Sequence, residues 1–590
     1  MPLIALSPVI SLGGARLDER WLDWLVDLKV DHQLQVPSRC TLRFHDPGYV
    51  LADSGKVELG TSVKVTDPAD TSLVLMDGEV TSVGVDQRVG EQPELVVVAH
   101  DKSHRLGRAT QVKTYLKMTY AEVVRRLAEE CGLSVSVDPT TLKADWLLQA
   151  DTGLGLLSEL ADRVGYDWWV EGTQLNFKQP SRAAGIGLRL GEDLLAFSAR
   201  ASGHHPSSVR VDGWDREVQQ AVSGSAGTVS SGVRARSKLA RIATMEAAAF
   251  GDATLTTSVL AVHSSAEADE LSQALLDRAG ATAVTAEGLT PGNGHLALGA
   301  TASVSDAGPL SGDYPITRVE HTFRPRSGFL TRFFSGDRRP TTLVDALGGA
   351  GLRRPRSATG MHPAVNVAQV TNVNDPDNQG RVKVRYPAIS EQEESFWARI
   401  VGIGGGANRG AVFIPEVNDE VLVAFEGGDP RQPVILGGLY GQRSTIPTPT
   451  VEEGKIQQRT FTSRLGHVIS LLDGTENEQQ AILLQLAGGN SSIRLGKDKC
   501  SVNVPSGTPV EIVAGDSSVK IANDGAITLS APQVTIAGQS KITLTAGEIA
   551  INADTRLSLQ GTVTAGLKGG QVQVQGEAAV SVTGSIVSIN

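Results

Sequence analysis

Cysteine and aromatic residues are scarce in this chain of 590 residues. Its three cysteines, Cys40, Cys131 and Cys500, are far apart and odd in number, which argues against a disulfide framework and suits a reducing compartment. Aromatic residues make up 4% of the chain, whereas glycine occurs 64 times. This composition favours Gly-, Ser- and Thr-rich β structure over a large α/β enzyme.

Long apolar runs and an excess of basic residues are also absent. No stretch of eighteen apolar residues occurs, so we expect no membrane-spanning helix. Residues 1–8 lack a basic region and are broken by prolines, so we expect synthesis in the cytoplasm without a signal peptide. The net charge of -11 argues against a nucleic-acid or anionic-membrane binder.

The most informative stretch is residues 370–440, where turn residues separate short alternating runs. The cluster Asp375 to Gly380 lies between two such runs and predicts a β-hairpin. Further strands are expected at 396–401, 411–415, 416–425 and 433–440, with no helix between them. Five or six short strands of this kind indicate a small closed barrel of the OB type.

The run NDPDNQGRVKVRYP, followed by FWARI and GAVFIPEVNDEVLVAFEGGDPRQPVILGGLY, resembles the OB-fold domain of VgrG-type spike proteins. That family also includes hub and spike proteins of contractile phage tails and extracellular injection particles. The residues that carry the resemblance are Asp375, Pro376, Gly380, Arg381, Val382, Val384, Pro387, Trp397, Pro415, Glu420, Val421, Phe425, Gly428, Asp429, Pro430 and Gly437.

Residues 1–340 predict two β-barrel subdomains with a few helices, and they resemble the hub of the same family. Helices are expected from the Thr119 and Glu122 capping box to Gly132, over 155–164, and from Ser264 to Gly280. Residues 216–238 lose all periodicity and predict a flexible loop. His100, Asp101 and His104 lie close together, but no nucleophile stands at a useful spacing, so we interpret them as a structural turn.

Between hub and barrel, residues 341–365 are rich in Gly, Pro and Arg and predict a linker that lets the two be positioned separately. Its arginines could instead bind an anionic partner. We assign 366–445 to the OB-fold domain and 446–518 to a neck with short strands. Residues 340–362, like 216–238, are expected to lack order before assembly.

Residues 519–590 carry a repeat of apolar-x-apolar triplets in steps of seven or eight residues, which predicts a β-solenoid. One chain cannot easily close such short strands, whereas three chains around one axis can pair them. At one strand spacing per step, this needle would be on the order of 45 to 50 Å long. A monomeric β-helix is the alternative. The predicted trimer core comprises Val519, Ile527, Val534, Ile542, Ile549, Leu557, Val572 and Val587.

The prediction is therefore a mainly β chain with two hub barrels, an OB-fold barrel and a C-terminal intertwined trimeric β-helix. The resemblance implies a homotrimeric, non-enzymatic spike of a contractile injection machine that caps the inner tube and punctures an envelope when the sheath contracts. It implies tube, hub-adaptor and baseplate partners, possible effector cargo, and only transient contact with a target membrane. No cofactor, metal or nucleic acid is expected. The particle would be cytoplasmic or released.

The needle has no metal-binding His-x-His near its end. We expect a separate PAAR-repeat protein to dock on that end, at Val587, Ser588, Ile589 and Asn590, because a blunt β edge invites association.

Two other functions stay open. A spike with a cell-wall hydrolase would need two carboxylates held apart on a substantial scaffold, whereas Glu391, Glu393 and Glu394 sit together in one barrel loop. A trimeric tail-fibre adhesin would leave the hub resemblance unexplained. The sequence does not distinguish a type VI apparatus from an extracellular particle or a phage-derived tail.

Overall fold

The computed structural model describes residues 7–181, 184–203, 205–215, 219–258, 262–339, 365–388, 390–448 and 450–589. The chain divides into two units, Met1–Thr445 and Ile446–Asn590. The first holds the hub and the OB domain, and the second holds the neck and the C-terminal repeat. Most of the predicted linker, 341–364, and the last residue, Asn590, lie outside the described residues.

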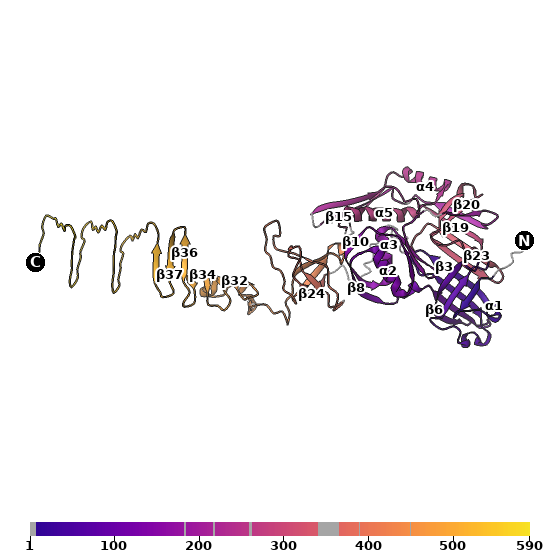
Figure 1. The fold of residues 1–590 in the computed structure, drawn as a ribbon, viewed down its shortest axis with the longest axis horizontal. Coiled ribbons are helices and arrows are strands. Elements are labelled where there is room, and N and C mark those ends of the chain that lie inside the picture. Colours follow the sequence, from indigo (N-terminus) through magenta and orange to yellow (C-terminus); the bar gives the residue numbers. More distant parts are fainter. Residues whose placement is uncertain are drawn as a thin grey trace. The chain divides into compact units, whose positions relative to one another are not determined.

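One eleven-stranded sheet runs through the hub in the order β14-β19-β23-β22-β3-β4-β7-β6-β5-β1-β2 (Figure 1). Its strands are β1 Val9–Leu12, β2 Ala15–Arg16, β3 Leu25–Gln33, β4 Arg39–His45, β5 Ser62–Thr66, β6 Val74–Asp86, β7 Glu94–His100, β14 Ala196–Ala201, β19 Val284–Pro291, β22 Arg318–Arg324 and β23 Gly328–Ser335. The pairing of β22 with β3 joins the N-terminal strands to strands from nearly three hundred residues later.

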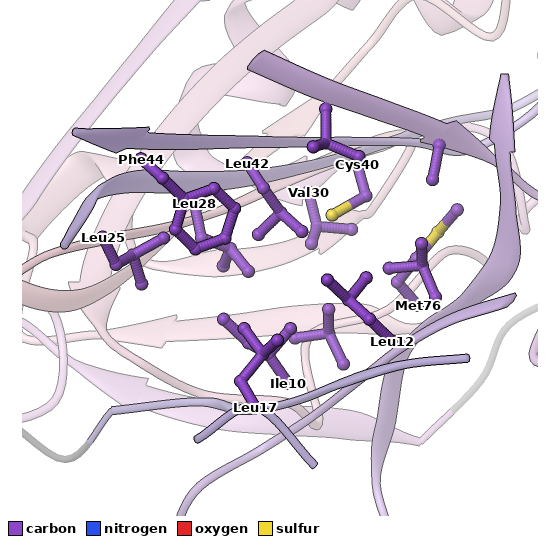
Figure 2. Close-up of a cluster of buried hydrophobic side chains, with 14 of the residues drawn as sticks. Ile10, Leu12, Leu17, Leu25, Leu28, Val30, Cys40, Leu42, Phe44 and Met76 are labelled. Atoms are coloured by element: carbon purple, nitrogen blue, oxygen red, sulfur yellow. The ribbon is translucent and has the colours of Figure 1, made fainter. Parts of the chain in front are cut away.

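Two hydrophobic cores lie along this sheet. In the first, inward-facing residues of alternating strands, such as Ile10, Leu28, Leu42 and Phe44, point toward one another (Figure 2). The short α1 Glu19–Asp23 adds Trp21, whose ring packs edge-on to Phe44 at 5.0 Å. The second core gathers residues of β19, β22 and β23 with those of a smaller sheet. The alternation seen in the sequence therefore places one face of each strand in a core.

Residues 110–178 of the hub form a helix-containing segment. It comprises β8 Thr110–Thr119, α2 Tyr120–Cys131, β9 Ser134–Val137, β10 Lys143–Thr152, α3 Gly153–Val164, β11 Asp167–Glu171 and β12 Gln174–Lys178. The capping box at Thr119 and Glu122 is present, and Gly132 ends α2 in the left-handed conformation. The second helix starts two residues before its predicted start, at an N-cap formed by Thr152. These two predictions are confirmed to within two residues.

The rest of the hub consists of two small sheets and two helices. Their elements are β13 Gly185–Arg189, β15 Ser208–Asp215, β16 Gln220–Ala226, β17 Arg236–Ser237, α4 Lys238–Ala249, β18 Thr254–Thr257, α5 Ser265–Ala281, β20 Thr301–Ser305 and β21 Gly312–Pro315. Ser264 caps α5 as predicted.

The prediction of a flexible loop over 216–238 is wrong for residues 220–226, whereas 227–235 are irregular. The strand β16 pairs antiparallel with β15 along seven residues and contributes Ala226 and Val222 to a core with Ala268 and Leu276 of α5. The segment is Gly- and Ser-rich because its backbone comes close to the helix: a Cβ at Gly224 would lie 2.3 Å from the Ala268 carbonyl carbon. Tertiary pairing here overrides a weak local preference.

The OB domain is a five-stranded sheet in the order β25-β24-β27-β28-β26. Its strands are β24 Asn366–Asn372, β25 Lys383–Arg385, β26 Arg399–Ile400, β27 Glu420–Phe425 and β28 Pro433–Gly438. The predicted hairpin is confirmed, because β24 pairs antiparallel with β25. The predicted strand at 411–415 is wrong: those residues are irregular, and Val412 and Phe413 are exposed. Without a buried face, an apolar run alone does not make a strand.

The second unit begins with short antiparallel strands. They are β29 Val451–Glu452, β30 Lys455–Ile456, β31 Gln458–Thr462, β32 Val468–Asp473, β33 Gln480–Gln485, β34 Ser492–Gly496, β35 Cys500–Asn503, β36 Val510–Ala514, β37 Ser517–Ile521 and β38 Ile527–Ser530. Described residues 531–589 hold no strand, and Figure 1 draws them as a repeating extended trace without arrows. The mainly β fold with an OB domain is confirmed, whereas the trimeric β-helix stays a prediction.

Candidate functional site: the OB domain and the apolar repeat

The first turn of the OB domain is held by Asp375 and Arg381. The Asp375 carboxylate accepts hydrogen bonds from Arg381 Nε at 3.0 Å and Nη2 at 2.6 Å. It also accepts from the backbone N–H groups of Asp377, Gln379 and Arg381. The Arg381 guanidinium and these N–H groups hold the pKa of Asp375 well below its usual range. The carboxylate thus organises the turn, and Gly380, with φ of +73°, closes it.

The barrel core follows directly from this turn. Val382 and Val384 are fully buried and pack with Val421 and Phe425 of β27. Beside them, the ammonium of Lys383 lies 5.4 Å from the centre of the Trp397 ring, a cation–π distance. These motif residues therefore form a packed scaffold.

The remaining motif residues mark where strands end and begin. Pro376 lies in the first turn and Pro387 follows β25 on the surface. Pro415 precedes β27, whose first residue, Glu420, pairs with Gln369 of β24. Gly437 lies opposite Leu422 at a point where the β27–β28 register shifts. These motif residues thus specify backbone geometry.

The second turn, Gly428, Asp429 and Pro430, carries a buried ionic network. Asp429 Oδ2 lies 2.7 Å from Arg431 Nη2, and the same guanidinium reaches Glu267 of α5 at 3.0 Å. Glu267 also lies 3.7 Å from Arg163 of α3. Burial alone would raise the pKa of Asp429, but Arg431 and Arg163 outweigh it and lower that pKa to about 2. The same two arginines outweigh burial at Glu267, whose pKa is also lowered.

This network joins the OB domain to the hub, and apolar packing reinforces it. Trp146, Leu148 and Ala150 of β10 belong to the same core cluster as the OB residues. Trp146 Nε1 donates to the carbonyl of Glu394 at 2.9 Å, and the Thr114 hydroxyl donates to Glu393. Hub and barrel therefore contact each other directly, whereas we expected a linker that lets the two be positioned separately; residues 341–364 of that linker lie outside the described residues.

No local pattern in the sequence indicates this interface. Arg431 follows the recognised GGDP turn, but its partner Glu267 is 164 residues away in the sequence and looked like an ordinary capping residue. Glu393 and Glu394, weighed as hydrolase carboxylates, contact the hub.

The cluster at His100, Asp101 and His104 is structural. Asp101 caps the 3-10 helix Lys102–Gly107 and accepts from the backbone N–H of Ser103 at 2.8 Å. His104 Nε2 is 2.7 Å from Glu79 Oε1. Among the described residues, no group of three or more His, Cys, Asp or Glu side chains is placed to hold a metal ion. None of the described helices is long and apolar enough to cross a membrane.

The predicted needle residues fall into two sets. Val519 lies in β37 opposite Ile512 and Leu529, and Ile527 of β38 lies opposite Ile521. Their strands pair within the chain, whereas we expected pairing with other chains there. The second set has no strand partner and is 50 to 54% exposed: Val534, Ile542, Ile549, Leu557, Val572 and Val587.

The second set forms a regular apolar ladder. Each of its members is followed two residues later by another exposed apolar residue, such as Ile536, Leu544 and Ile551. Monomeric proteins rarely expose apolar residues in so long and regular an array. Val587 and Ile589 continue it, and Ser588 is exposed between them, to the end of the described residues.

Comparison with known families identifies the class of the OB domain. The model of the type VI secretion system/phage-baseplate injector OB domain matches residues 366–440. A second model, of the Alg8 N-terminal domain, matches residues 64–324. Residues 366–440 are therefore an OB domain of the baseplate-injector class.

The chain is similar to VgrG-type spike proteins. Over 75 residues it is 41% identical to the type VI secretion system spike protein VgrG3 of Vibrio cholerae. This match covers 12% of this chain and 7% of that protein. Over 75 residues it is 36% identical to the actin cross-linking toxin VgrG1 of Vibrio cholerae, with the same coverage. An Escherichia coli component of the type VI secretion system aligns in structure over 70% of this chain and 96% of its own, with 15% identity and a TM-score of 0.42.

Proposed function

We propose that this chain is a structural spike of a contractile injection machine, made of a hub, an OB barrel and a needle. The OB domain supports the class, since its family model and the VgrG relatives both match there. Its packed motif and its contact with the hub suit a load-bearing part. In this proposal the chain performs no chemistry of its own.

The observation that carries the proposal is the apolar ladder of residues 534–589. Its triplets have unpaired backbone groups and half-exposed Ile, Val and Leu side chains. Three copies wound around one axis would pair those backbone groups and bury the ladder. Closed threefold symmetry achieves this with one type of interface. The result is a stiff homotrimeric needle, which suits puncture of an envelope.

The hub would then seat on the inner tube and contact baseplate proteins, and a PAAR-type tip protein would dock at Val587, Ser588, Ile589 and Asn590. The machine would carry the chain out of the cytoplasm in which it is made. If the purified trimer bound no such tip protein encoded beside it, the docking part of the proposal would fail.

Two neighbouring substitutions test the ladder. Ile549→Lys places a charge on it, and we expect the variant to fail to trimerise or to dissociate at lower denaturant concentration, because an unpaired charge is costly to bury. Ala550→Lys, one residue on, places the same charge on the opposite face of the triplet and should assemble as the wild type does. Equal assembly of the two variants would contradict the three-chain needle. Light scattering with added urea distinguishes these results.

A further inference from the structure

A cavity of about 660 Å³ opens on the hub beside the start of α4. Strand β17 leads into this helix, and Figure 1 shows α4 near β19 and β20. The side chains that line the cavity are short or cationic. The polar ones are Arg234, Arg236, Ser237, Lys238, Arg241 and Ser311. No carboxylate lines it, although acidic residues outnumber basic residues, 65 to 54, in the whole chain.

The four cations of this cavity lie close together on the surface of the hub. All four are exposed, and no carboxylate of the described residues forms an ion pair with Arg234, Arg236, Lys238 or Arg241. The carboxylate opposite Arg236 in the β17–β21 ladder, Asp313, accepts a hydrogen bond from Ser303 Oγ at 2.7 Å and does not line the cavity.

The backbone adds to the positive potential. The first turn of α4 contains no acidic residue and begins with Lys238, although a helix N-terminus favours negative charge. Ser237 Oγ accepts a hydrogen bond from the backbone N–H of Ala240, in that first turn, at 3.0 Å. Like charges gathered at the positive end of a helix repel one another, so an anion placed among them would relieve that repulsion.

The shape and lining favour a protein ligand over a small molecule. Pockets for small ligands are lined mostly by apolar and aromatic side chains, whereas half of the eight lining residues here are cations and none is aromatic. Three of the cations are arginines, whose planar guanidinium matches a carboxylate with two parallel hydrogen bonds. Strand β17 is also an edge strand of its sheet, so an extended segment could lie along it.

We propose that this basic cavity, formed by Arg234, Arg236, Lys238 and Arg241, docks an acidic, Asp- or Glu-rich segment of a partner protein. None of the residues that line this cavity belongs to the OB motif or to the apolar ladder. The proposal therefore goes beyond the spike function, and its failure would leave that function untouched.

The test uses the full chain and fluorescein-labelled octaglutamate, with binding followed by fluorescence anisotropy at low salt. We expect saturable binding that weakens as salt is added and is about tenfold weaker in Arg236→Ala/Arg241→Ala. The control variant, Arg88→Ala/Arg326→Ala, removes two arginines from the tips of other hub hairpins and should bind within twofold of the wild type.

Circular dichroism melts establish that both variants are folded. Should the first double variant fail to fold, Arg234→Ala/Lys238→Ala replaces it with the same expectation. The proposal is overturned if octaglutamate fails to bind the wild-type chain, or if both double variants bind equally well. Tighter binding of octathymidylate than of octaglutamate would also overturn it, because the cavity would then favour a nucleic acid.

Discussion

Removing the Arg431 guanidinium should loosen the OB domain from the hub. In Arg431→Met the apolar stem is kept, but Asp429 and Glu267 lose the cation at 2.7 and 3.0 Å. Glu267 keeps the Arg163 guanidinium at 3.7 Å and the backbone N–H of His263 at 3.1 Å. Removing one partner of a buried pair costs about 3–5 kcal/mol, because the other charge stays buried without compensation. At about 1.4 kcal/mol per tenfold change, exchange of protected amides should accelerate at least about a hundredfold.

Native-state hydrogen exchange, read by mass spectrometry on β10 and β27, measures this loss where the two domains meet. The matched control is Arg189→Met, whose ion pairs with Glu192 and Asp306 are more than half exposed on both sides and should contribute about 1 kcal/mol or less. If Arg431→Met and Arg189→Met gave equal exchange in β10, the network would not hold the domains together.

The same network sets a pH dependence. The pKa of Asp429 is lowered to about 2 and that of Glu267 is lowered as well. A depressed carboxyl pKa stabilises the folded state above the ordinary value near 4, and this stabilisation is lost as the pH falls toward 2. The protection of β10 amides against hydrogen exchange should therefore fall between about pH 4 and pH 2 in the wild type. In Arg431→Met this protection should depend much less on pH.

Three further predictions concern single residues. Arg381→Ala leaves Asp375 with backbone partners only and should lower the free energy of unfolding of the OB domain by about 2–3 kcal/mol in urea titrations, whereas a loss below about 0.5 kcal/mol would contradict the role of this pair. Gly380→Val forces a β-branched residue to a φ of +73° and should cost about 1–2 kcal/mol by the same measurement; an unchanged midpoint would refute it. Burial lowers the pKa of His321 to about 3, so the neutral form is kept in the fold and hub stability should fall as the pH drops from about 6.5 toward 3. In His321→Gln, the melting temperature should depend less on pH across that range than in the wild type. An equal dependence of the melting temperature on pH in the two proteins would contradict this.

The parts of the fold that depend on local chemistry could be predicted from the sequence. The Thr119 and Ser264 caps fix the starts of two helices through hydrogen bonds within four residues, and the Asp375 turn is likewise local. Strand β16 was missed because its Gly and Ser residues suit close packing on α5, a contact that no local pattern records. The apolar run at 411–415 was predicted as a strand because the sequence does not show whether an apolar residue finds a buried face.

The interface between hub and OB domain could not be predicted for the same reason. It depends on Arg431 meeting Glu267 and on Trp146 reaching Glu394 across more than 160 residues of sequence. The apolar repeat is the opposite case. Its period is visible in the sequence, and in the proposed trimer its partners are other chains, which a single chain does not supply.

We propose that the apolar ladder of residues 534–589 is completed by two further copies of the chain. Light scattering on the purified protein measures this most directly. Three copies of the 62.1 kDa chain have a mass of about 186 kDa, and we predict a single species of that mass that persists in mild denaturant. A stable, soluble species of about 62 kDa would contradict the account, since the apolar ladder would then need no partner chain.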